Sequence, residues 1–132
     1  MLTKWLFAAP LIVHGSAHIS GFIASWTKNL AGYSENPWIF SSDITFQNPV
    51  GRAFGLLWLI AAIGFIATGV GLVFGQSWWP ILAIAASVIS LVVIVPWWNS
   101  VPPGAKVGAV FDVLVILAML LPVKDKILDL IQ

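Results

Sequence analysis

Four long stretches of this 132-residue chain carry almost no charge, and they constrain its fold more than any other feature. Charged residues make up 8% of the sequence and hydrophobic residues 60%, whereas a soluble domain has about 25% charged residues. So few charges cannot cover the surface of a small soluble protein, so lipid must cover part of it. We therefore expect a single domain over residues 1–132, folded as an all-α integral membrane protein.

The four apolar stretches have the length of membrane-spanning helices, which need about 20 mainly apolar residues. They predict spans at about residues 5–26, 51–74, 78–98 and 104–122. Tryptophans flank the first and third, as is typical of segments that end at the two membrane interfaces. A tight turn at Gln76 makes the second and third spans antiparallel neighbours, so we predict an antiparallel four-helix bundle.

Small residues spaced four apart predict where these helices approach one another. Gly104 and Gly108 in the fourth span, and Ala86 and Ser90 in the third, have this spacing. Such pairs allow close backbone contact in lipid. We expect them to serve packing within the bundle more often than contact between two copies of the chain.

The segment between the first two spans, residues 27–50, is the one long loop that the sequence predicts. Its aromatic residues argue against disorder, and long loops in compact proteins are commonly functional. We expect it to be structured and to lie back on the bundle as a cap. The tail, residues 124–132, is predicted to be a short amphipathic extension of the fourth span.

An even number of spans places both termini on the same side of the membrane. The positive-inside rule is nearly balanced, with three basic residues on each side: Lys4, Lys124 and Lys126 against Lys28, Arg52 and Lys106. The terminal amine favours a cytoplasmic location for both termini. There are no cysteines, so disulfides and thiolate sites are excluded, and no basic run indicates nucleic-acid binding.

Polar residues inside a membrane are costly, and each is therefore a candidate for function. His14 and His18 are four residues apart and share one face of the first span. At 1.5 Å per residue they lie about 13 Å and 12 Å from the nearer flanking tryptophans, which places both near the membrane midplane. Their side chains are expected to face the bundle interior.

Three residues on other spans are expected at a similar depth. Asp112 lies about 9 Å into the fourth span, and Arg52 opens the second span on the side where the first one ends. Trp58, about 9 Å beyond Arg52, could form a wall of the same pocket. The predicted site therefore comprises His14, His18, Arg52, Trp58 and Asp112, with Arg52 holding either Asp112 or an anionic headgroup.

Three interpretations of this cluster stay open. It could be structural, with Asp112 pairing with Arg52 or with a histidine, because polar contacts hold membrane bundles together. It could bind or transform a lipophilic or amphiphilic molecule, since histidine exchanges protons near neutral pH. It could also be a metal site formed by His14, His18 and Asp112, a single-histidine haem site, or a proton pathway in a transporter.

The function favoured by the sequence is binding of a lipophilic or amphiphilic molecule, or of a partner membrane protein, through this cluster. The partner could also be a further copy of this chain, in a homo-oligomer. A proton-coupled transporter, a metal-binding or haem-binding protein, and a membrane enzyme for a lipid-soluble substrate remain alternatives. No nucleophile elbow, phosphate-binding loop or dinucleotide fingerprint is present, so no sequence motif names a reaction.

Overall fold

The structure, a computed structural model, describes residues 2–131, and within this range it contains α-helices and no strand. The helices are α1 (Leu2–Trp26), α2 (Pro49–Val73), α3 (Trp79–Ile94), α4 (Pro103–Leu120) and α5 (Val123–Ile131). The prediction of an all-helical chain is confirmed. Three of the helices, α1, α2 and α4, are long and apolar enough to cross a membrane, as expected of a membrane protein.

Local sequence signals explain where the helices begin and end. The side chain of Asn48 caps α2 by accepting a hydrogen bond from the Gly51 amide at 3.1 Å, and proline occupies the first position of that helix. Gly75, at φ 66°, makes the turn after α2 that an L side chain would strain. Pro122 separates α4 from α5, because a proline cannot continue the hydrogen-bonding pattern of a helix.

Glycines let α1 and α2 pack with their backbones in close contact. A Cβ atom added to Gly15 would lie 2.8 Å from the Phe65 Cβ atom and 2.9 Å from the Ala62 carbonyl oxygen. One added to Gly69 would lie 2.5 Å from a side-chain carbon of Ile12. Close approach through small residues is the usual way in which membrane helices associate. The α1–α2 pair is therefore the framework against which the other helices are placed.

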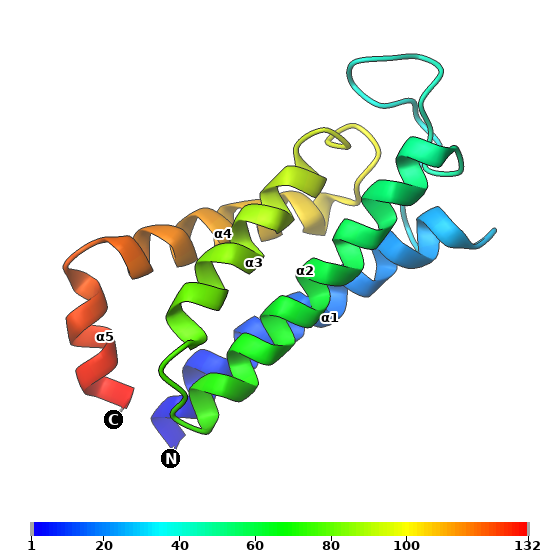
Figure 1. Ribbon diagram of the computed structural model, residues 1–132. Helices are drawn as coiled ribbons and strands as arrows, with labels where there is room; N and C mark the ends of the chain where they lie inside the picture. Colours follow the sequence, from blue (N-terminus) through cyan, green and yellow to red (C-terminus); the bar gives the residue numbers. More distant parts are fainter. Residues whose placement is uncertain (1, 132) are drawn as a thin grey trace.

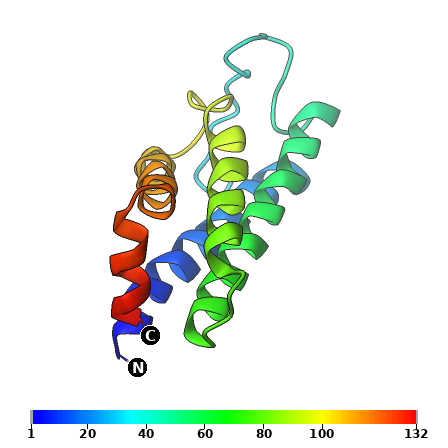
Figure 2. The same ribbon diagram turned by 60° about the vertical axis from the view of Figure 1, so that its left-hand side comes forward.

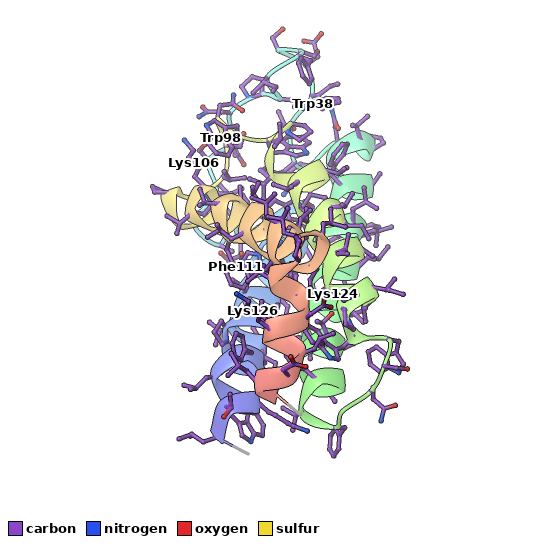
Figure 3. All side chains as sticks on the ribbon, turned by 90° about the vertical axis from the view of Figure 1, so that its left-hand side faces the viewer. Trp38, Trp98, Lys106, Phe111, Lys124 and Lys126 are labelled. Atoms are coloured by element: carbon purple, nitrogen blue, oxygen red, sulfur yellow. The ribbon has the colours of Figure 1, made fainter. Side chains whose placement is uncertain are left out.

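The chain runs between two ends of the molecule (Figure 1). The loop end contains residues 27–48 and the connection 95–102, while the terminal end contains the start of α1, the α2–α3 turn and α5. Figure 3 shows Trp38, Trp98 and Lys106 towards the loop end and Lys124 and Lys126 nearer the opposite one. The helices α1, α2 and α3 each lead from one end to the other, and α5 leads from the end of α4 back to the terminal end, where the start of α1 and the end of α5 both lie.

The arrangement of α4 differs from the predicted antiparallel bundle, in which the axes of all four helices would be roughly aligned. In Figure 1 the axes of α1, α2 and α3 are broadly aligned, whereas α4 crosses them steeply. Figure 2 shows α4 almost end-on while α3 is seen from the side. The tail also differs from a simple extension, because α5 turns away from α4 and packs Ile131 into the core at the terminal end. Residue 132 of the predicted tail lies outside the described residues.

The third helix is shorter than predicted. The span expected at 78–98 is a helix over Trp79–Ile94, and 16 residues extend about 24 Å. Residues 95–100 form turns, and Trp97 is fully buried among aromatic residues of the loop. Trp97, one residue before the predicted end of the span, therefore belongs to the cap and not to the helix.

The loop between α1 and α2 lies back on the connection between α3 and α4, in agreement with the expected cap. The Ser34 amide donates to the Ser100 carbonyl at 3.0 Å, and the Ser100 hydroxyl donates to the Asn36 carbonyl at 2.9 Å. Two loop aromatics, Tyr33 and Phe46, are buried at 5% and 1% exposure. Burial of aromatic side chains and backbone hydrogen bonds together order this segment.

Candidate functional site

The two histidines of α1 sit in the middle of the helix and face the interior, as predicted. His14 lies 12 residues from each end of α1 (2 + 12 = 14 and 26 − 12 = 14). Its ring meets Phe65 of α2 edge-on, with centroids 4.7 Å apart, and lies 4.9 Å from the Phe111 ring of α4. The His18 ring lies 4.6 Å from that of His14. These aromatic contacts fix both imidazoles deep inside the helix assembly.

A hydrogen-bonded chain, called here the polar network, connects His14, Asp112, Ser90 and His18. The His14 Nε2 atom lies 2.9 Å from Asp112 Oδ1, and the Ser90 hydroxyl lies 2.5 Å from Asp112 Oδ2. The same hydroxyl lies 2.7 Å from His18 Nε2. The His18 Nδ1 atom closes the chain with a 3.0 Å contact to the backbone carbonyl of His14. Three helices, α1, α3 and α4, therefore meet through side-chain hydrogen bonds.

Burial makes this network costly to break. Asp112 and Ser90 are fully buried and His18 is 2% exposed, whereas the His14 side chain keeps 13% exposure. A buried polar group that loses its partner keeps its full desolvation cost. Within the network, His14 is thus the member that reaches accessible space.

Gly108 of α4 provides the space that the His14 ring occupies. A Cβ atom at this position would lie 2.7 Å from His14 Cε1 and 3.3 Å from Nδ1. Gly104, one turn earlier, has open space around it, with no atom within 4 Å of a Cβ placed there. The predicted small-residue pair in the fourth span therefore has two different roles: one glycine admits the imidazole, and the other borders an opening.

A cavity of about 210 Å³, called here the His14 cavity, adjoins the exposed side of His14. Trp58, Tyr33, Ile94 and Pro102 form apolar and aromatic walls, and Gly108 lies beside the imidazole. Ala17 of α1 and Gly104 of α4 are exposed and also line it, so the cavity opens between these two helices. An opening between two apolar helices allows entry from the lipid phase.

The polar atoms around the cavity are few. The His14 Nδ1 atom has no hydrogen-bond partner in residues 2–131, and it is not one of the fully enclosed atoms without partners. The indole nitrogen of Trp58 is enclosed and lacks a partner in the same range. Burial raises the pKa of Tyr33 to about 12, and a weak contact with Ser20 lowers it by less. Tyr33 therefore presents a neutral phenol at neutral pH.

The structure brings together four of the five residues predicted for the site and separates the fifth. His14, His18 and Trp58 line the cavity, and Asp112 supports His14 from behind. Arg52 is exposed near the loop end, where its guanidinium lies 5.7 Å from the centre of the Trp26 ring. Of the two partners expected for Asp112, Arg52 or a histidine, the structure shows the histidine, because Asp112 pairs with His14 while Arg52 lies in the first turn of α2.

The metal interpretation of His14, His18 and Asp112 also finds no support in this geometry. In residues 2–131 no group of three histidine, cysteine, aspartate or glutamate side chains is arranged to hold a metal ion. Both ring nitrogens of His18 are already engaged, one with the His14 carbonyl and one with Ser90. A histidine whose two nitrogens are hydrogen-bonded has no lone pair directed at a metal.

Sequence reasoning missed the residue that joins the two halves of the network. Ser90 was identified as a small packing residue because a serine in an apolar helix gives no other signal. Tyr33 was assigned to the cap, yet its ring also lies 5.5 Å from that of Trp58 and borders the cavity. A search for hydroxyl groups on the neighbouring predicted span, at the depth of the predicted intramembrane carboxylate, could have found Ser90, but not Tyr33.

Comparisons of the chain with protein-family models, with curated proteins and with solved structures found no match. The function of the site must therefore be argued from its geometry.

Proposed function

We propose that this chain is an integral membrane protein that binds a lipophilic or amphiphilic molecule in the His14 cavity. The observation that carries the proposal is the His14 imidazole at the edge of an aromatic cavity between α1 and α4, with its Nδ1 atom beside the lining residue Gly108 and without a hydrogen-bond partner among residues 2–131. Ligand sites of this kind combine an apolar lining with a few polar groups that fix orientation. An engineered apolar cavity of about 150 Å³ binds benzene, so a cavity of 210 Å³ accommodates a ring with substituents.

Entry from the bilayer fits the position of the site. His14 lies at the centre of α1, and its cavity opens beside exposed apolar side chains. A ligand could insert a polar ring between α1 and α4 while its apolar remainder stays in lipid. The cavity between α1 and the steeply crossing α4 (Figure 2) provides the room for this ring.

We propose four membrane crossings, formed by α1 to α4, with both termini on the cytoplasmic side. The alternation of α1, α2 and α3 between the loop end and the terminal end, and the length and apolar composition of α4, support this topology. The short helix α3 would need the local bilayer to thin or its flanking tryptophans to reach the interface. The amphipathic helix α5 would lie in the interface at the terminal end.

The absence of native cysteines makes this topology directly testable. Single-cysteine variants Ser42→Cys and Asn99→Cys place a thiol at the loop end, and Ser77→Cys and Lys124→Cys place one at the terminal end. In intact cells, a membrane-impermeant maleimide is expected to label the loop-end pair only. Labelling of one loop-end site and one terminal-end site would contradict four crossings.

Ligand binding is tested by native mass spectrometry of the protein released from mild detergent. We expect an additional mass of reproducible size, which Ala17→Phe removes by blocking the opening of the cavity. Val13→Phe is the matched control, because Val13 is 68% exposed on the same helix and does not line the cavity. A bare chain at its sequence mass would contradict the proposal. A mass equal to several chains, or to the chain plus another protein, would favour a homo-oligomer or a partner membrane protein instead.

A further inference from the structure

The polar network fixes which ring nitrogen of each histidine carries a proton. A backbone carbonyl can only accept a hydrogen bond, so the 3.0 Å contact with the His14 carbonyl requires a proton on His18 Nδ1. When Asp112 Oδ1 carries no proton, it can only accept the hydrogen bond in its contact with His14. The proton of that hydrogen bond must then be on His14 Nε2. A neutral His14 then carries a lone pair on Nδ1, the atom beside the cavity.

Ser90 adds a second constraint, because one hydroxyl proton serves two close contacts. Its oxygen lies 2.5 Å from Asp112 Oδ2 and 2.7 Å from His18 Nε2, and it can donate to only one of them. The other contact needs a proton from its partner, which is either a protonated Asp112 or a doubly protonated His18. An ionised Asp112 with two neutral histidines would therefore be one proton short. The network needs one additional proton to make all of its hydrogen bonds.

Burial decides where this additional proton resides. Both candidate carriers, Asp112 and His18, are almost fully enclosed. The uncharged arrangement has Asp112 donating to Ser90 and Ser90 donating to His18 Nε2, whereas the alternative is a buried ion pair with a large desolvation cost. The uncharged arrangement satisfies every contact of the network and leaves His14 neutral. At neutral pH the polar atom that His14 directs towards the cavity is thus a hydrogen-bond acceptor.

We infer that the ligand of the His14 cavity is a lipophilic phenol or alcohol whose hydroxyl group donates a hydrogen bond to His14 Nδ1. This inference rests on the proposed function and names the chemical class of its ligand. The aromatic rings of Trp58 and Tyr33, which line the cavity, suit a flat ring bearing that hydroxyl.

The titratable groups that face His14 are His18 from α1, Asp112 from α4 and Tyr33 from the loop; α2 contributes the uncharged Phe65, and α3 contributes the uncharged Ile94 to the cavity lining. Arg52 and Lys106 pair instead with Trp26 and Trp98 near the loop end.

The test compares three ring compounds of similar size with the full-length protein in lipid nanodiscs: naphthol, methoxynaphthalene and naphthoquinone. Calorimetry at neutral pH is expected to show naphthol binding about tenfold more tightly than methoxynaphthalene, the change expected from one hydrogen bond to a buried acceptor. Naphthoquinone, which has no hydroxyl group to donate, should bind no more tightly than methoxynaphthalene. Equal affinity for naphthol and methoxynaphthalene would overturn the inference.

Two variants separate the failure of this inference from other failures. His14→Phe keeps a ring in place and is expected to remove the preference for naphthol. Asp112→Asn imitates the protonated carboxyl group, since its amide can donate to Ser90 and accept from His14, and it should keep that preference. Loss of the preference in a folded Asp112→Asn protein would contradict the uncharged arrangement. If no ring compound binds and Ala17→Phe changes nothing, the proposed function fails as well.

Discussion

Two cavities lie between α1 and α4, one on each side of the contact between His14 and Asp112, and they differ in chemistry. The His14 cavity faces the loop end and contains histidine, phenol and indole groups. The second, of about 160 Å³ and called here the apolar cavity, lies towards α5 and is lined by residues such as Leu6, Phe7, Leu11, Phe111, Val115 and Ala118. Both spaces are lined by α1 and the steeply crossing α4, but histidine and phenol groups line only the first. Of the two cavities, only the His14 cavity can therefore orient a ligand, because the polar network presents a hydrogen-bond acceptor to it.

The largest difference between the two regions should appear in stability. Asp112→Ala removes the partner of both His14 and Ser90, so unfolding in denaturing detergent should require about 2–4 kcal/mol less free energy. Val115→Ala, beside the apolar cavity, should cost about 1 kcal/mol, because it enlarges a space that already exists. Equal losses for the two variants would show that the network contributes no more than apolar packing does.

Two glycines of α4 offer a sharper comparison within one helix. Gly108→Ala should lower the free energy of unfolding by about 1–3 kcal/mol, because the new methyl group would displace the His14 ring. Gly104→Ala meets open space and should change stability by no more than about 0.5 kcal/mol. Thermal unfolding of the two variants in the same detergent checks the difference. A tolerated Gly108→Ala would mean that the imidazole is not held against α4.

The cavities should also differ when each is filled. Ala17→Phe should abolish naphthol binding, whereas Ala118→Phe, in the apolar cavity, should change its affinity by less than about threefold because it leaves the His14 cavity intact. Equilibrium dialysis with each variant measures the effect. Loss of binding in Ala118→Phe alone would move the ligand site to the apolar cavity.

The smallest effect concerns Tyr33, the single tyrosine of the chain. Its pKa is raised to about 12 by burial, from the ordinary value of 10.0, so phenolate absorbance should appear about two pH units later in the folded protein than after unfolding. Because the folded form retains the proton longer, this group contributes stability below pH 10 that is lost as the pH rises towards 12. A titration midpoint near 10 in the folded protein would place Tyr33 in contact with water.

The sequence predicts the helical class, which follows from composition. It predicts one layer of His18, Arg52 and Asp112 with His14 one turn deeper, whereas in the structure Asp112 bonds directly to His14 and Arg52 lies in the first turn of α2. Counting residues along a span does not give this depth when α4 crosses the other helices steeply. The steep angle of α4 and the bridge formed by Ser90 depend on contacts between helices distant in the chain, which periodicity does not encode.

The shortened α3 shows a related limit. Its apolar composition continues through Trp97 and Trp98, yet the chain leaves the helix after Ile94 because Trp97 packs on Phe46 of the loop, with ring centroids 4.4 Å apart. Tertiary burial of one indole ring here outweighs the local preference for a continuing apolar helix. Hydropathy alone cannot distinguish a tryptophan at the lipid interface from one that anchors a cap.

The most direct test of the central claim is nitrogen NMR of the protein labelled with ¹⁵N-histidine. The chain has two histidines, so the spectrum contains four ring signals, and a His18→Asn variant assigns them. At neutral pH we predict that His14 carries its proton on Nε2, that its Nδ1 is unprotonated, and that naphthol shifts the Nδ1 signal. A His14 protonated on both nitrogens at neutral pH, or an Nδ1 signal indifferent to naphthol, would contradict the account.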